Sequence, residues 1–140
     1  MHLPTKTALE NEKWDYVILQ DQSISPIAKK DAFQQCAGEL CRLIRENGAK
    51  PVFYATWAYK DGSEKLAKTG LGYEEMLTGL YDRYHQAADA GNALTADAGM
   101  AFHKVEGIVE LYAEDNFHPS PAGSVLAASV IAETIRKDQQ

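Results

Sequence analysis

The sequence contains little that would suggest a disulfide-stapled, nucleic-acid-binding or membrane-spanning protein. Only 2 of its 140 residues are cysteines, and lysine and arginine never form a cluster longer than two adjacent residues. No apolar run approaches the roughly 20 residues that a membrane-spanning helix needs, and residues 1–13 have no apolar stretch typical of a signal peptide. With a net charge of −6, the chain is not expected to bind nucleic acid or a membrane. None of these absences identifies the compartment.

The two cysteines do not indicate a redox or metal site. Cys36 and Cys41 are five residues apart, which on a helix places them about 140° apart. A disulfide between them or a shared metal is therefore not expected, and Cys36 is interpreted as a small buried apolar residue. Because no other potential ligands show a recognisable metal spacing, we expect no metal and no cofactor.

The length and composition are typical of one domain, residues 1–140. A chain of this length can bury about 70% of its unfolded surface, and its hydrophobic share of 45% is ordinary. Runs rich in β-branched and aromatic residues alternate with segments of helical spacing: strands are expected at 14–19, 51–58 and 93–97, and helices at 33–47, 73–91 and from 120. This alternation predicts an α/β fold with three layers, α/β/α, and a mainly parallel sheet.

Some segments carry more specific expectations. The apolar run 14–19 is typical of a strand that is buried on both faces of a parallel sheet. The polar, glycine-punctuated stretch 59–72 is expected to be a surface loop or a lid. For residues 99–113 the sequence leaves two alternatives, a short helix or irregular structure. In the last helix, Ser120 is expected to be the N-cap and Pro121 the first helical residue, with four residues forming the buried side: Val125, Leu126, Val130 and Ile135.

Polar residues follow the first two predicted strands at the place where ligands bind in parallel sheets. Such ligands lie beyond the carboxyl ends of the strands. Gln20, Gln22 and Ser23 directly follow the first strand, so a site is expected there. Trp57, at the end of the second strand, is either a core residue or the wall of a substrate pocket.

The segment DNFHP, 115–119, contains an acid and a histidine three residues apart. A histidine can remove a proton from a hydroxyl nucleophile and return it to a leaving group, and it works best when a carboxylate orients it. Asp115 could orient His118 in this way within one tight loop. The alternative is a solvated polar turn that precedes the last helix.

In several segments the chain resembles the SGNH, or GDSL-type, hydrolase superfamily, in particular a bacterial branch that is mainly uncharacterised. The segments are DNFHPSPAGSVLAASVI near the C-terminus, KWDYVILQDQS (13–23), PVFYATWA (51–58) and GMAF (99–102). The resemblance implies an SGNH or flavodoxin-like sheet, with His118 as the catalytic base and Asp115 as its orienting acid. It also implies that Gln22, where the superfamily usually has an asparagine, donates to an oxyanion, with Gln20 as the neighbouring candidate.

The superfamily's nucleophile is a serine in a Gly-Asx-Ser block upstream of the segment that matches WDYVIL. Residues 1–13 contain neither serine nor glycine, so the fold is expected to lack the superfamily's first strand or strands. Ser23 is the best-placed internal substitute, although it lacks flanking glycines; otherwise it caps a turn or the following helix. Little or no esterase activity is therefore expected of this chain alone.

Two hypotheses about function follow. In the first, the chain is a serine esterase or an inactive fragment of one, acting on small-molecule or carbohydrate esters such as O-acetyl groups. In the second, it is a non-catalytic binding module on an α/β scaffold. This hypothesis predicts that Asp115 and His118 are not within hydrogen-bonding distance, or that His118→Ala leaves ligand binding unchanged. We expect His85 to be a surface or half-buried residue, and His103 to be a weaker candidate for the site.

An exposed sheet edge is a further expectation. If the strand at 14–19 lacks the neighbour that it has in the superfamily, its backbone groups are unpaired along an apolar edge. Such edges pair readily with other chains. The sequence therefore predicts a homo-oligomer that forms through this edge.

Overall fold

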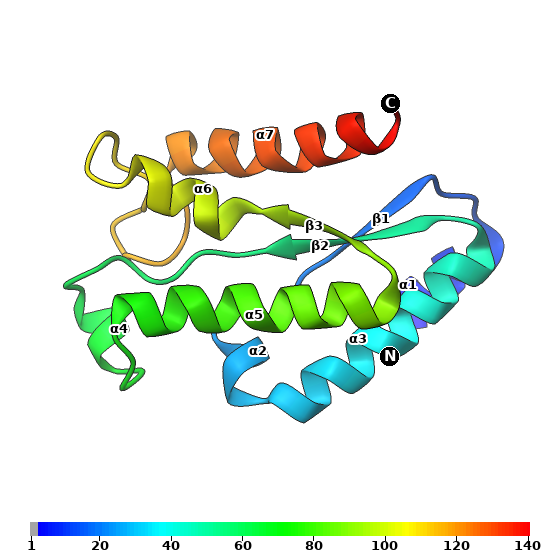
Figure 1. Ribbon diagram of the computed structural model, residues 1–140, viewed down its shortest axis with the longest axis horizontal. Helices are drawn as coiled ribbons and strands as arrows, with labels where there is room; N and C mark the ends of the chain where they lie inside the picture. The colour runs from blue at the N-terminus through cyan, green and yellow to red at the C-terminus, as the bar shows by residue number, and fades with distance from the viewer. Residues whose placement is uncertain (1–2) are drawn as a thin grey trace.

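A computed structural model describes residues 3–140 as a sheet with helices on both faces (Figure 1). In chain order the elements are α1 (Leu3–Asn11), β1 (Tyr16–Leu19), α2 (Ser25–Ala28), α3 (Lys30–Asn47), β2 (Lys50–Ala55), α4 (Glu64–Ala67), α5 (Tyr73–Gly91), β3 (Leu94–Asp97), α6 (Ala98–Val105) and α7 (Pro121–Asp138). Among the described residues, no helix is long and apolar enough to cross a membrane.

The sheet is parallel throughout, with the strand order β1-β2-β3. Helices α3 and α5 pack on one face, and α6 and α7 lie on the other (Figure 1). The predicted three-layer α/β/α fold is therefore confirmed. All three strands run in the same direction. Their carboxyl ends, at Leu19, Ala55 and Asp97, therefore lie together at one end of the sheet.

The buried stripe of α3 contains Cys41 and not Cys36, which the sequence predicted to be buried. Its members are spaced by three or four residues, as expected of an amphipathic helix: Phe33, Ala37, Cys41 and Ile44. Cys41 is fully buried, whereas Cys36 is exposed. The prediction of a buried Cys36 was wrong because Cys36 lies one position before Ala37, outside the stripe that faces the sheet. The helix ends at Gly48, whose φ of +93° suits glycine.

Helix α7 begins as predicted but packs differently. Ser120 Oγ accepts a hydrogen bond from the Gly123 N–H at 3.1 Å, and Pro121 is the first helical residue. Val125 is 67% exposed, so its predicted burial was wrong. The buried residues of α7 are Gly123 and Ala127. At Gly123 the helix approaches the preceding loop too closely for a larger side chain, and Ala127 packs in the cluster that contains Phe102 and Leu111.

The N-terminal part of the chain holds two differences from expectation. Strand β1 is not buried on both faces: Ile18 is 39% exposed, because β1 is an edge strand. Residues 3–11 form α1, which apolar spacing did not predict since only Leu9 is buried in it. His2 lies outside the described residues.

A polar contact connects the end of α7 to the start of the sheet. Asp138 Oδ2 accepts hydrogen bonds from the Tyr16 hydroxyl at 2.6 Å and from Lys50 Nζ at 2.7 Å. The bond from Lys50, and secondly that from Tyr16, holds the pKa of Asp138 below its ordinary value. Asp138 thus joins the last helix to β1 and β2.

Replacing Asp138 with asparagine is expected to lower the Tm at neutral pH, because the neutral amide cannot form an ion pair with the Lys50 ammonium. A carboxylate with a lowered pKa contributes stability above its ordinary value of 3.8 and loses this contribution as the pH falls through the lowered value. The difference in Tm between the two proteins should therefore shrink below about pH 3.8. Thermal unfolding followed by circular dichroism measures it, with Asp82→Asn, an exposed carboxylate on α5, as the control. An undiminished difference in acid would contradict the prediction.

Candidate active site

A pocket of about 340 Å³ lies at the carboxyl ends of β1 and β2. Three segments that are far apart in the sequence form its walls: the residues after β1, the end of β2 with the residues after it, and the loop before α7. Its lining residues are Gln20, Gln22, Ser23, Tyr54, Thr56, Trp57, Tyr59, Phe117, His118 and Pro119. The fold thus brings the predicted site residues to one pocket, except for Asp115, which contacts it through His118, and the weaker candidate His103.

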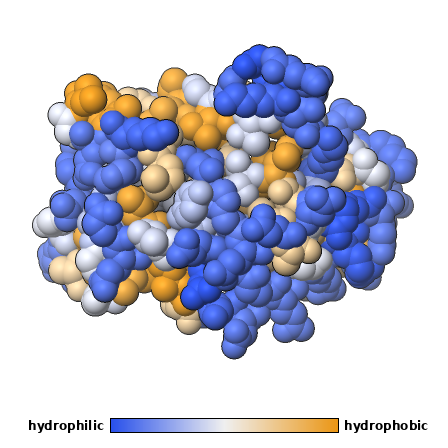
Figure 2. All heavy atoms as spheres, in the orientation of Figure 1, coloured by the Kyte–Doolittle hydropathy of each residue, from blue (hydrophilic) through white to orange (hydrophobic). Residues whose placement is uncertain are grey.

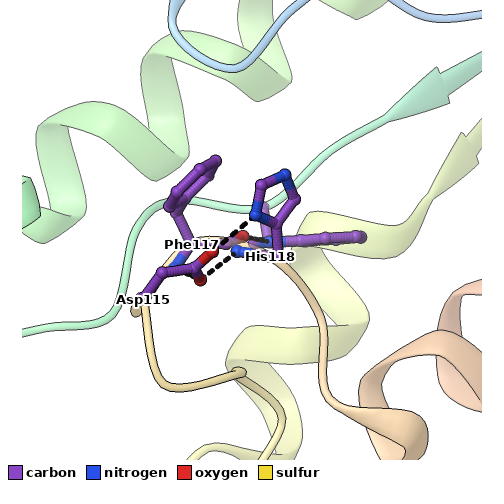
Figure 3. A network of polar contacts seen from close by, with 4 residues as sticks. Asp115, Phe117 and His118 are labelled. Atoms are coloured by element: carbon purple, nitrogen blue, oxygen red, sulfur yellow. Dashed lines mark hydrogen bonds and ion pairs between the residues drawn. The ribbon is translucent and has the colours of Figure 1, made fainter.

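Asp115 and His118 form a hydrogen-bonded pair (Figure 3). Asp115 Oδ2 lies 2.5 Å from His118 Nδ1, and Asp115 Oδ1 accepts from the backbone N–H groups of Phe117 at 3.2 Å and His118 at 2.9 Å. The bond with the imidazole, more than any other cause, lowers the pKa of Asp115 to about 2. An ionised carboxylate only accepts, so Nδ1 carries the proton. This leaves Nε2, which is directed away from Asp115 (Figure 3), free to act as a base.

The loop that carries this pair is held in place by the segment after β2. The Trp57 indole Nε1 donates to the Phe117 carbonyl at 2.9 Å, and the Lys60 N–H donates to the Asn116 carbonyl at 3.0 Å. Trp57 also stacks on Phe102 of α6, with ring centroids 4.1 Å apart. Trp57 is therefore a pocket wall and a packed residue at once, and its N–H positions the backbone next to His118.

Residues 59–72 cover one side of the loop, as a lid would. They include the short helix α4, and Tyr59 and Leu66 are buried rather than exposed. Lys65 Nζ lies 4.1 Å from the centroid of the Phe117 ring, a cation–π contact. The same ring is 3.9 Å from the ring of His118. The lid thus contacts the histidine through Phe117.

Ser23 has an unusual backbone conformation. Its φ of +39° lies in the left-handed region, which costs a non-glycine residue about 1 kcal/mol or more. Such strain is found where the fold requires a side chain to point in a particular direction. The Ser23 side chain is half-buried and lines the same pocket as His118 and Gln22, while the two glutamines are exposed at the rim.

Thr56 is a pocket residue that sequence reasoning missed. It is 7% exposed, and its enclosed hydroxyl lies close to the buried Tyr84 hydroxyl. Its position directly after the second strand was the available signal, but the sequence indicated only the neighbouring Trp57 as a pocket residue.

The remaining histidines lie elsewhere. A larger groove of about 970 Å³ follows the free edge of β3, lined by residues of α5 and α7. His103 lines this groove and contacts the Tyr73 hydroxyl at 3.2 Å, so it is not part of the His118 pocket. His85 is half-buried, as expected, and pairs with Asp97 at 2.7 Å. In the part of the chain that the structure describes, no group of three or more histidine, cysteine or acidic side chains could hold a metal ion.

Comparisons with known proteins give two informative matches, both to solved structures. No protein-family model and no curated protein match the sequence. One structure, "a putative SGNH hydrolase from Slackia heliotrinireducens", is 41% identical with a TM-score of 0.90, over 94% of this chain and 71% of its own. Another, a DUF4886 family protein from Bacteroides uniformis, is 25% identical with a TM-score of 0.75, over 93% of this chain. This chain spans 53% of the second protein.

Proposed function

Because this chain belongs to the SGNH hydrolase family, we propose that it hydrolyses esters, with Ser23 as nucleophile, His118 as general base and Asp115 as the carboxylate that orients it. One observation supports this above all. The imidazole of His118 is bonded to Asp115 at 2.5 Å through Nδ1, and it lines a pocket that also contains a serine on strained backbone. A solvated turn would not require either feature.

The proposed reaction is acyl transfer in two steps. His118 Nε2 takes the proton of the Ser23 hydroxyl as the oxygen attacks the ester carbonyl, and the negative charge moves to the carbonyl oxygen. The side-chain amide of Gln22, or of the neighbouring Gln20, donates to this oxyanion. The imidazolium then protonates the departing alkoxide, leaving an acyl-Ser23 ester. Water attacks that ester with His118 again as base, and this releases the acid and restores the serine.

The pocket composition favours a neutral, hydroxyl-rich substrate. The lining contains no aspartate, glutamate, lysine or arginine, and four of its residues are the aromatic side chains Tyr54, Trp57, Tyr59 and Phe117. Aromatic surfaces with amide and hydroxyl groups between them suit the apolar faces and hydroxyls of a sugar. We therefore propose a carbohydrate O-acetyl ester as the substrate class.

The test is hydrolysis of p-nitrophenyl acetate, combined with mass spectrometry of the acetylated protein. We expect slow turnover, because Ser23 lacks the flanking glycines of an efficient nucleophile, with acetyl found on Ser23. His118→Ala should lower the rate about 100-fold or more, and Ser23→Ala should abolish the adduct. His85→Ala, which changes a histidine outside the pocket, is the matched control. If His118→Ala and the wild type hydrolyse the ester equally, or neither exceeds buffer, the proposal is wrong and a non-catalytic binding module remains.

A further inference from the structure

Tyr84 of α5 joins the buried core to the turn that follows β1. It is 0% exposed, and its ring meets Phe33 of α3 edge-on, with ring centroids 5.4 Å apart, and lies 6.2 Å from the ring of Phe53 on β2. Figure 2, in the orientation of Figure 1, shows mainly hydrophilic atoms along α3, whose buried stripe includes Phe33. Because the ring is packed against both elements, the Tyr84 hydroxyl has little freedom to move.

The Tyr84 hydroxyl is bonded to the backbone of Asp21. It accepts from the Asp21 N–H at 3.2 Å and donates to the Asp21 carbonyl at 3.4 Å. Burial holds the pKa of this hydroxyl above its ordinary value, so it keeps the proton that it donates. The last pair of the β1–β2 ladder is Leu19 with Phe53, and alternate residues of a strand direct their backbone groups to the same side. Tyr84 thus bonds the backbone just beyond the point where β2 stops pairing with it.

From Asp21 a chain of hydrogen bonds encloses the strained Ser23. Asp21 Oδ1 accepts from the Gln22 N–H at 2.7 Å, and the Gln22 carbonyl accepts from the Ser25 N–H at 2.7 Å. A residue in the left-handed region persists only where its surroundings hold it there. Ser23, with its φ of +39°, lies between Gln22 and Ser25. These bonds, and their attachment to Tyr84, therefore hold its conformation.

We infer that Tyr84 is a positioning residue for the esterase reaction proposed above, on which this role rests: its hydroxyl sets where the turn of residues 20–23 lies relative to His118. The same hydroxyl lies close to that of Thr56, at the end of β2. Tyr84 thus contacts both of the strand ends that form the pocket. It is not one of the lining residues, so it acts through the turn and touches no substrate.

Removing this hydroxyl should slow the reaction without weakening substrate binding. Tyr84→Phe keeps the ring and its packing, but it leaves both backbone groups of Asp21 without this partner. Because a misplacement of 1 Å can cost about 100-fold in rate, we expect the kcat for p-nitrophenyl acetate to fall about tenfold or more. The KM should stay within about twofold of the wild-type value, since the pocket lining is unchanged. The kcat is expressed per molecule whose Ser23 can be acetylated, so that unfolded protein is not counted.

The matched control is Tyr73→Phe, which removes the hydroxyl of another buried tyrosine of α5. Tyr73 contacts His103 at 3.2 Å and is not part of the pocket lining. Its kcat should stay within about twofold of the wild-type value. Circular dichroism verifies the fold of each variant, and all rates are measured well below each Tm. Equal losses of kcat in the two variants would contradict the inference.

Amide hydrogen exchange followed by NMR tests the same role without a substrate. In Tyr84→Phe the exchange rates of the Gln22 and Ser25 N–H groups should rise about tenfold or more, because the turn opens more often. Neither N–H is bonded to Tyr84 itself, so the rise reports the whole turn. Tyr73→Phe should leave both rates unchanged. Asp21→Ala, which removes only the acceptor of the Gln22 N–H, should raise both rates as well.

The two readouts separate this inference from the proposed function. If the wild type does not hydrolyse p-nitrophenyl acetate faster than buffer, the esterase proposal is wrong, and the exchange rates alone decide whether Tyr84 holds the turn. Unchanged exchange at Gln22 and Ser25 in Tyr84→Phe overturns the inference, whatever the activity. Faster exchange with an unchanged kcat overturns it too, because the position of the turn then does not set the rate.

Discussion

Replacing Gly123 with alanine is expected to destabilise the protein by about 3 kcal/mol, the upper part of the range for overpacking, and to lower the Tm by about 10 °C. A Cβ there would overlap the Leu111 carbonyl oxygen, which is backbone and cannot rotate away. It would also lie 3.1 Å from both Phe102 Cζ and Pro119 Cβ. Because Pro119 follows His118, displacement of this loop should also disturb the Asp115–His118 contact.

The control is another glycine on a helix. Gly38 of α3 has nothing within 4 Å of the position that its Cβ would occupy. Gly38→Ala should therefore stabilise the protein by about 0.5–1 kcal/mol, the ordinary gain from reduced backbone freedom. Thermal or urea unfolding of the three proteins measures both effects. If Gly123→Ala changes the stability by the same sign and amount as Gly38→Ala, α7 does not pack against the loop as described.

Asp115→Asn is expected to lower the proposed esterase rate about 100-fold or more. The asparagine has nearly the same shape, but its amide can donate to Nδ1 and so favour the tautomer in which Nε2 carries the proton and cannot act as a base. The side chain of Asp115 is 42% exposed, so water partly replaces its effect. The loss should therefore be smaller than for a fully buried carboxylate.

The pH dependence adds a second readout for this pair. Since the pKa of Asp115 is held at about 2, chiefly by the bond from His118, the carboxylate stays ionised above about pH 4. Any fall in the rate between neutral pH and pH 4 must therefore come from another group. Initial rates with p-nitrophenyl acetate from pH 4 to neutral pH measure this dependence. The control is Glu114→Gln, which changes the exposed carboxylate next to Asp115. Equal losses in Asp115→Asn and Glu114→Gln would show that Asp115 has no specific role.

The elements that sequence reasoning located best are those with local signals. The proline and serine at the start of α7, and the glycine after α3, act through backbone groups of their own neighbours. The alternation of strands and helices likewise determines the parallel sheet, because a helical connection between two strands almost always returns to the same side with the strands parallel. The Asp115–His118 contact is local too, within one turn of four residues. Its pattern alone raised the hypothesis of an acid–base pair.

The sequence by itself therefore determined the class of fold, the ends of several elements and the two residues of the candidate acid–base pair, Asp115 and His118. Tertiary structure decided which members of a periodic pattern are buried: Cys41 and not Cys36, and Gly123 and not Val125. It also decided that β1 is a half-exposed edge strand among residues 3–140 and that Thr56 is buried beside the pocket. Periodicity determines the spacing of a buried face, but burial at each position depends on which distant segment packs there and how closely.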